Sequence, residues 1–136
     1  MSNYIIPTLK YKDAATAIEW LCQAFGFEKH LVVPGEAGSI EHAQLKLNGD
    51  MIMVGSVRDS PFDQLQKTPH AVGEAVTQSP YIIVEDVDAH YHRAVSAGAV
   101  IAMEPEDQDY GGRLYSCMDP EGHLWNFGSY NPWETL

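Results

Sequence analysis

Two stretches of the chain carry the same order of apolar and polar positions. An apolar run over residues 5–11 leads to Asp13 and then to apolar residues at three- and four-residue spacing, which predicts a strand and an amphipathic helix. An apolar run over residues 81–85 leads to Asp86 and a second stripe of this kind. Apolar or alternating runs predict further strands over residues 28–33, 40–47, 51–55, 100–104, 113–118 and 123–129. Each half is therefore predicted to form a β-α-β-β-β unit.

The repeat keeps a nearly constant offset, because three kinds of marker recur after 72 or 73 positions. These markers are the helix N-caps Asp13 and Asp86, the helix-ending glycines Gly26 and Gly98, and the turn glycines Gly49 and Gly122. Three coinciding pairs are hard to obtain by accident, so we interpret the chain as an internal duplication.

We expect one α+β domain over residues 1–136, with units over about 4–55 and 79–130. Residues 56–78 join them in a Pro-, Gln-, Gly- and Ser-rich segment without clear periodicity, which we expect over a pocket mouth or at a dimer contact. A four-stranded sheet with one helix leaves one face uncovered. The two mixed sheets are therefore expected to curve around a central cavity, a natural site for a small molecule.

Composition and charge limit the classes of partner that the chain is expected to bind. The chain has 136 residues, 45% of them hydrophobic, and a formal net charge of -11, which disfavours nucleic acid and anionic membrane surfaces. No apolar run approaches the ~20 residues of a membrane span, and the first residues lack the basic and apolar pattern of a signal peptide. Cys22 and Cys117 lie far apart and are expected to be reduced. The cytoplasm is the expected compartment.

Two segments in the second half are the most specific motifs. Residues 109–115 read Asp-Tyr-Gly-Gly-Arg-Leu-Tyr, and residues 119–128 read Asp-Pro-Glu-Gly-His-Leu-Trp-Asn-Phe-Gly. Together with the helical opening over residues 14–27, they resemble the glyoxalase/bleomycin-resistance branch of the vicinal oxygen chelate superfamily. The resemblance covers nearly the whole chain and implies paired β-α-β-β-β units, a small-molecule ligand and frequent homodimers.

The resemblance also implies where a metal would be bound. Catalytic members of the superfamily hold a divalent ion through His and Glu, seven residues before each helix-opening Asp and four residues after each turn glycine. Here these positions are occupied by Ile6, Met53, Ser79 and Asn126. None of the four is a good ligand for a hard or borderline divalent ion. We therefore expect no metal site and no cofactor.

Strand alternation assigns candidate ligand-binding residues to the uncovered faces. The predicted lining mixes Met, Ile, Leu and Tyr with Thr, Gln, Ser and Asn, which suits a neutral or modestly polar, partly aromatic compound. By the same alternation Trp125 is expected to face the helices. The candidate ligand-binding residues are Thr8, His42, Gln44, Met53, Tyr81, Tyr110, Arg113, Tyr115 and Asn126.

Two candidates have an alternative role. Tyr110 and Arg113 border a Gly-Gly loop. In one interpretation they rim the pocket, and Arg113 pairs with an anionic group of the ligand. In the other, Arg113 binds Asp109 or Glu121 and fixes the loop. The Asn-Pro-Trp sequence at 131–133 either stacks on the pocket mouth or packs on a partner subunit.

The remaining histidines do not form a metal-binding pattern. His90 and His92 are two positions apart on the second predicted helix, whose apolar stripe contains Tyr91, Ala94 and Val95, so both are expected to be solvated. His123 follows a turn and is expected to make a surface or turn contact.

Two functions remain open. The preferred hypothesis is a metal-free binding or resistance-type protein that sequesters a small organic molecule; bleomycin is one option, and the acidic charge favours cations. The rival is an enzyme, either a lyase or isomerase with His42 or Tyr115 as acid/base, or a metalloenzyme with a displaced site that includes Glu41, His42 or Glu121. No nucleophile elbow, phosphate-binding loop or Cys-x-x-Cys motif occurs. The resemblance favours a homodimer.

Overall fold

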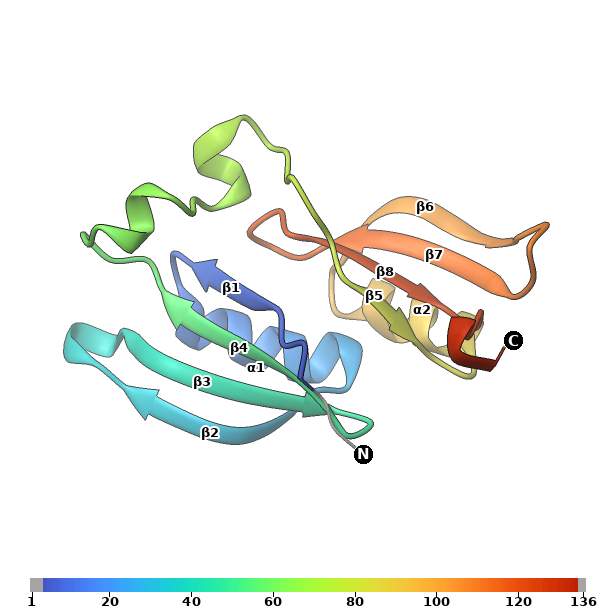
Figure 1. Ribbon diagram of the computed structural model, residues 1–136, viewed down its shortest axis with the longest axis horizontal. Helices are drawn as coiled ribbons and strands as arrows, with labels where there is room; N and C mark the ends of the chain where they lie inside the picture. Colours follow the sequence, from blue (N-terminus) through green and yellow to red (C-terminus); the bar gives the residue numbers. More distant parts are fainter. Residues whose placement is uncertain (1–3, 135–136) are drawn as a thin grey trace.

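A computed structural model describes residues 4–134 and contains two modules of the predicted β-α-β-β-β order (Figure 1). Module 1 consists of β1 (Thr8–Tyr11), α1 (Ala14–Phe25), β2 (Glu28–Pro34), β3 (Ile40–Leu47) and β4 (Asp50–Ser56). Module 2 consists of β5 (Tyr81–Ile83), α2 (Val87–Ser96), β6 (Val100–Asp107), β7 (Arg113–Met118) and β8 (Leu124–Gly128). None of the helices in this described part is long and apolar enough to cross a membrane.

Each module contains one four-stranded mixed sheet, which confirms the predicted α+β fold. The strand orders are β1-β4-β3-β2 and β5-β8-β7-β6, with one parallel pair in each sheet. The duplication extends to the register. Thr8 pairs with Met53 in module 1, and Tyr81 pairs with Asn126, each 73 positions later, in module 2.

The predicted helix boundaries have the expected chemistry. Asp13 accepts a hydrogen bond from Thr16 N at 3.2 Å, and Asp86 accepts one from Ala89 N at 3.0 Å. Gly26 ends α1 with φ of 92°, a left-handed conformation that is costly for residues with a Cβ. Local sequence therefore determines where both helices begin and where α1 ends.

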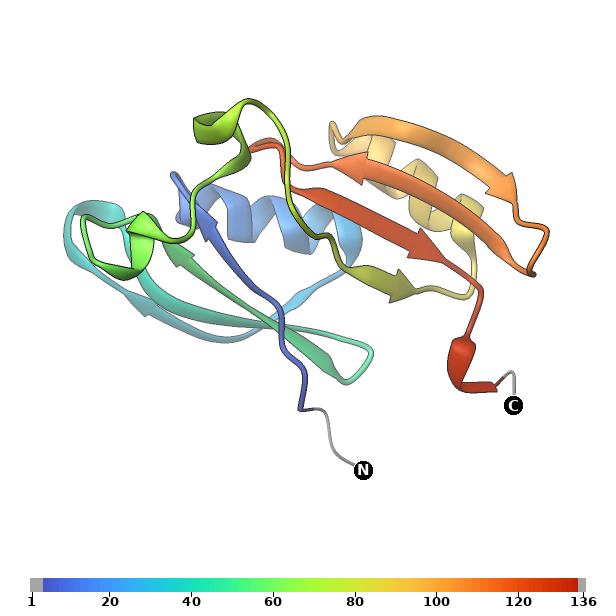
Figure 2. The same cartoon turned by 45° about the horizontal axis from the view of Figure 1, so that its top comes forward.

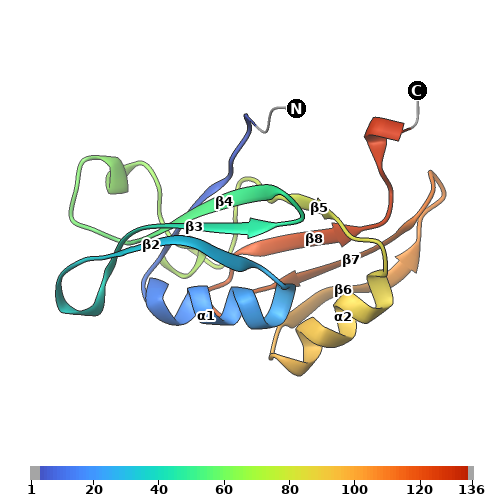
Figure 3. The ribbon, with the colours of Figure 1, turned by 90° about the horizontal axis from the view of Figure 1, so that it is seen from below.

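Both helices lie on the same side of the two sheets, so each sheet has an uncovered face on the opposite side (Figure 3). The core fills the space between sheets and helices, and its largest fully buried side chains include Trp125, Tyr115 and Phe127 from module 2 and Phe25 from α1. Trp125 faces the helices, as alternation predicts.

The two helices cap each other across the module boundary. Trp20 Nε1 on α1 donates to Ala97 O at the end of α2 (2.7 Å). Arg93 on α2 donates from Nε to Gln23 O (2.8 Å) and from Nη2 to Cys22 O (3.1 Å). Trp20 and Arg93 are 73 positions apart and play equivalent roles. Carbonyls at the C-terminal end of each helix thus accept hydrogen bonds from the other module.

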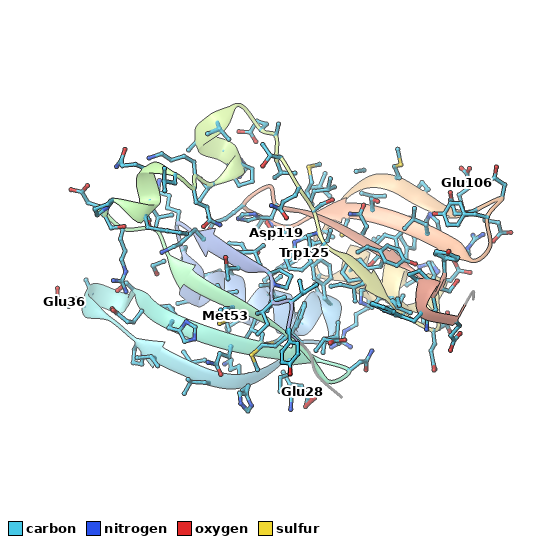
Figure 4. All side chains as sticks on the ribbon, viewed as in Figure 1. Glu28, Glu36, Met53, Glu106, Asp119 and Trp125 are labelled. Atoms are coloured by element: carbon cyan, nitrogen blue, oxygen red, sulfur yellow. The ribbon has the colours of Figure 1, made fainter. Side chains whose placement is uncertain are left out.

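A buried carboxylate joins the modules on one side. Asp119, only 3% exposed, accepts hydrogen bonds from Tyr11 Oη (2.5 Å) and Trp125 Nε1 (3.0 Å) through Oδ2. Its Oδ1 accepts from the main-chain N–H groups of Glu121 (3.0 Å) and His123 (3.1 Å). Burial, with Asp119 as a further cause, raises the pKa of Tyr11 well above its ordinary value. Four donors offset the cost of removing this charge from water. Figure 4 shows Asp119 and Trp125 together at the module junction.

The turn that contains Asp119 makes further contacts with module 1. The Glu121 carboxylate accepts the N–H groups of Lys12 (2.6 Å) and Asp13 (2.8 Å). His123 Nε2 donates to Lys10 O at 2.8 Å. His123 is therefore a buried turn residue rather than one at the surface.

The linker lies along β1 and the β7–β8 turn (Figure 2). Buried Asp63 accepts the Arg58 N–H (2.6 Å) and the Ser60 hydroxyl (3.0 Å), and lies 3.4 Å from Lys10 Nζ. His70 Nε2 donates to Pro120 O at 3.3 Å. The linker thus touches both modules at the junction that Asp119 organises.

We expect Asp119→Ala to lower the free energy of unfolding by about 3 kcal/mol, because Tyr11 and Trp125 would keep buried donors without an acceptor. Urea denaturation followed by tryptophan fluorescence measures the change. Glu106→Ala, at an exposed position on β6, is the matched control. A loss below about 1 kcal/mol for Asp119→Ala would show that the junction does not depend on this carboxylate.

Candidate functional site

A cavity of about 1080 Å³ lies between the two modules. Its walls come from the segments before β1 and β5, the β3–β4 hairpin, the α1 C-terminus and the first turns of α2. None of the linker residues 56–78 lines it. We call it the inter-module cavity; its lining residues are Ile5, Pro7, Phe25, Gly26, Phe27, Leu47, Asn48, Asp50, Met51, Ile52, Pro80, Tyr81, Ile82, Ile83, Val84, Glu85, Asp86, Ala89, His90, Arg93 and Trp133.

The uncovered face of module 1 brings four predicted residues together. The register places Gln44 beside Met53, and Met53 beside Thr8, on neighbouring strands. The Gln44 amide donates from Nε2 to Nε2 of His42 at 3.1 Å. The amide nitrogen can only donate, so Nε2 of His42 is the acceptor in this contact.

The uncovered face of module 2 has a polar group centred on Asn126. Asn126 Nδ2 donates to Ser79 Oγ (2.8 Å) and Pro80 O (3.0 Å), and its Oδ1 accepts from Ser116 Oγ (2.7 Å). Tyr81 pairs with Asn126 on the adjacent strand. Ser116 was not among the predicted residues, although its offset of 72 from Gln44 marks it as the equivalent position.

Tyr115 and Arg113 lie on the helix side of their sheet, away from the uncovered face. Tyr115 is fully buried. Arg113 donates from Nε to Asp88 (2.9 Å) and from Nη1 to Asp107 (3.1 Å), rather than binding Asp109 or Glu121. The alternation of β7 explains both positions, because Tyr115 pairs with Phe127, whose side chain faces α2.

Tyr110 belongs to an aromatic group at the edge of module 2. Its ring centroid lies 5.1 Å from that of Tyr130, and Tyr81 Oη donates to Tyr130 O at 2.6 Å. Tyr81 lies across Gly128, where a Cβ would come within 2.6 Å of its hydroxyl. Trp133 lines the inter-module cavity and is 88% exposed. Of these aromatic residues, Tyr81 and Trp133 line the cavity.

His90 is part of the inner cavity wall, and the expectation that it is solvated was wrong. Its Nδ1 accepts from Tyr115 Oη (2.6 Å), and its Nε2 donates to Phe25 O (3.0 Å). Its ring lies 4.2 Å from that of Phe127. Burial lowers the pKa of His90, so the neutral form is favoured. His92, on the same helix, is exposed as expected.

The side chains present do not fit a divalent metal. Among residues 4–134, no group of three or more His, Cys, Asp and Glu side chains is arranged to hold one. The two positions in module 2 that the resemblance marks as ligands, Ser79 and Asn126, hydrogen-bond to each other. A hydroxyl and an amide bonded in this way are poor ligands for zinc, iron or manganese.

The acidic residues of a displaced site are also engaged elsewhere. Glu41 forms an ion pair with Arg58 at 2.6 Å. Glu121 holds two main-chain N–H groups at the module junction. Neither carboxylate therefore lies with His42 in a displaced metal site.

The fold and the site can be compared with known proteins. A family model described as the Glyoxalase/Bleomycin resistance protein/Dioxygenase superfamily matches residues 6–127. The chain belongs to this superfamily. An uncharacterized protein of Mycobacterium bovis is 35% identical over 122 residues, covering 90% of this chain and 80% of that protein. An uncharacterized protein of Mycobacterium tuberculosis H37Rv is also 35% identical over 122 residues, and the match covers 90% of this chain and 71% of that protein.

Solved structures of the superfamily share the arrangement. TioX from Micromonospora sp. ML1 has a TM-score of 0.75 and 32% identity, covering 96% of this chain and 100% of that chain. The fosfomycin resistance protein FosX from Listeria monocytogenes, solved with Mn(II) and sulfate, has a TM-score of 0.71 and 17% identity, covering 100% and 96%. At that identity FosX supports the fold alone.

The burial of His90 makes stability depend on pH. Above about pH 6.5 the imidazole is neutral in both states and adds no slope. As pH falls below that value the unfolded chain takes up a proton more readily than the folded one, so the free energy of unfolding should fall. Urea denaturation between pH 5.5 and 8 measures this slope.

His90→Gln should remove part of the loss seen at acidic pH, whereas His92→Gln, at an exposed position on the same helix, should not. Equal pH slopes for the wild type and His90→Gln would contradict the assignment of His90 as a half-buried neutral group.

Proposed function

We propose that the chain is a metal-independent cytoplasmic binding protein, of the bleomycin-resistance type, that holds a small organic molecule at the inter-module cavity and the adjoining uncovered faces. The observation that carries the proposal is the chemistry of the four superfamily ligand positions, Ile6, Met53, Ser79 and Asn126. They provide apolar side chains, a hydroxyl and an amide where metal-binding relatives need imidazole or carboxylate.

The uncovered faces beside the cavity combine hydrogen-bonding and apolar side chains. Gln44 on module 1 and Asn126 on module 2 provide amide groups that both donate and accept hydrogen bonds. Apolar side chains flank them, as at the strand pairs with Met53 and Tyr81. The cavity volume of about 1080 Å³ is close to the upper end of the range for pockets that hold drug-sized ligands.

Enzymatic acid/base chemistry would have to rest on His42. Tyr115 is buried, bonded to His90, and has a pKa raised by burial, so it has neither access nor reactivity. His42 is half-buried on the uncovered face, with its Nε2 held by Gln44. A single imidazole without a second catalytic group favours binding over catalysis.

A second copy of the chain is part of this proposal. Both uncovered faces open on the same side of the molecule and do not close over one another (Figure 3). The outermost strands carry exposed apolar side chains on these faces, namely Leu31, Val33, Val100 and Met103. A homodimer would cover them and enclose the ligand.

The first test is metal content together with ligand stabilisation. Elemental analysis and native mass spectrometry should find no stoichiometric Zn, Ni, Mn or Fe. A thermal-shift screen of drug-sized organic compounds should give hits whose stabilisation is the same with a chelator and with added divalent metal. One tightly bound transition metal per chain, or stabilisation that requires metal, would overturn the proposal.

Gln44→Leu should weaken the binding of a compound found in this screen about tenfold, because the change removes hydrogen-bonding groups from the uncovered face. Isothermal calorimetry measures the affinity. Gln64→Leu, at an exposed position in the linker, is the matched control and should leave it unchanged.

Light scattering should give about twice the chain mass of 15.1 kDa. A Leu31→Glu, Met103→Glu double variant should shift the protein towards the monomer, because charge on the uncovered faces opposes their burial. Leu65→Glu changes an equally apolar residue that is 84% exposed in the linker, and it should leave the dimer intact. A monomeric wild type would refute this part of the proposal.

A further inference from the structure

The duplication has two equivalent contacts between modules, and only one of them is closed. On the closed side, the β7–β8 turn of module 2 sits on the corner between β1 and α1. There the Glu121 carboxylate holds the N–H groups of Lys12 and Asp13. Asp119 and His123 complete the contact by binding Tyr11 Oη and Lys10 O.

The equivalent elements on the other side enclose the inter-module cavity. The corner between β5 and α2 places Val84, Glu85 and Asp86 in its lining, at an offset of 73 from Tyr11, Lys12 and Asp13. The β3–β4 hairpin, equivalent to the β7–β8 turn, contributes Asn48 and Asp50. The cavity therefore occupies the place that the turn fills on the closed side.

The charges differ between the two sides. Lys12 on the closed side corresponds to Glu85 on the open side, and His123 corresponds to Asp50, because both pairs are 73 positions apart. Asp86 adds a third carboxylate to the cavity lining. The two basic positions are therefore acidic on the open side, whereas Glu121 and Asp119 of the closed side correspond to Asn48 and Lys46.

The basic groups of the cavity offset only part of this negative charge. Arg93 already donates to the C-terminal carbonyls of α1 at Cys22 and Gln23. His90 uses both ring nitrogens within the protein and is neutral. The lining therefore contains three carboxylates, of which Asp86 also caps α2, and one guanidinium, within a chain of net charge -11.

The body of the cavity is apolar and partly aromatic. Phe25 and Phe27 come from the α1 end, and Tyr81 and Trp133 come from module 2. Aromatic faces attract cations in addition to providing apolar contact. The same cavity therefore combines a surface for an apolar body with an acidic border.

We propose that the inter-module cavity selects organic cations, with the charged group of the ligand facing Asp50, Glu85 and Asp86 and its apolar body on the aromatic wall. This inference rests on the proposed function, because it names the ligand class of that binding site. The cavity provides the space that binds the ligand, and the carboxylates favour a ligand with a positive charge.

Three probes that share a benzyl group and differ in charge test the preference: benzyltrimethylammonium, benzyl alcohol and phenylacetate. Calorimetry or ligand-observed NMR with the full chain at low salt should show the cation binding at least about tenfold more tightly than the other two. Added salt should weaken only the binding of the cation.

Asp50→Asn and Glu85→Gln should each weaken binding of the cation about fivefold, because each removes one carboxylate with little change in shape. Both residues are exposed, so folding should be unaffected. Binding of benzyl alcohol should not change in either variant. Glu106→Gln, an exposed change on β6, is the control for total charge.

Equal or tighter binding of benzyl alcohol or phenylacetate would overturn the inference while leaving small-molecule binding intact. Failure of all three probes to bind would also overturn it, and the compound screen described above then decides the proposed function separately. Loss of cation affinity in Glu106→Gln equal to that in Glu85→Gln would show attraction to overall charge rather than to the cavity.

Discussion

A single buried carboxylate determines how the two modules meet. Asp119 receives one donor from β1, one from β8 and two from its own turn, so its charge is satisfied only when both modules are in place. An ion taken out of water and then deprived of a partner is among the most costly defects in a protein interior. The relative placement of the sheets, and therefore the inter-module cavity, depends on this arrangement.

The sequence predicted the fold well because its determinants are local and repeated. Asp13 and Asp86 cap helices within three residues of themselves, and strand alternation correctly turned Trp125 towards the helices. One mixed sheet in each module follows from the β-α-β-β-β order that both halves share. The role of Asp119 in joining the modules could not be predicted from the sequence, because its partner Tyr11 is 108 residues away.

The candidate site was predicted only in part, and the reason differs from residue to residue. His42 and Gln44 meet because alternation on a regular strand fixes their face. Tyr115 was a candidate because of its hydroxyl, and its place on the helix side follows only from its pairing with Phe127. His90 is covered because α2 packs against α1 as well as its sheet, whereas Val95, expected in the apolar stripe, is 43% exposed.

The crossed capping of the helices has a consequence for how such a chain arose and how it could be divided. Trp20 closes the end of α2, and Arg93 closes the end of α1, so each half supplies what the other lacks. A fragment cut within the linker would expose bare carbonyls and an apolar flank. Ancestral half-length chains are thus expected to have associated in pairs, and two modern fragments should complement each other rather than fold independently.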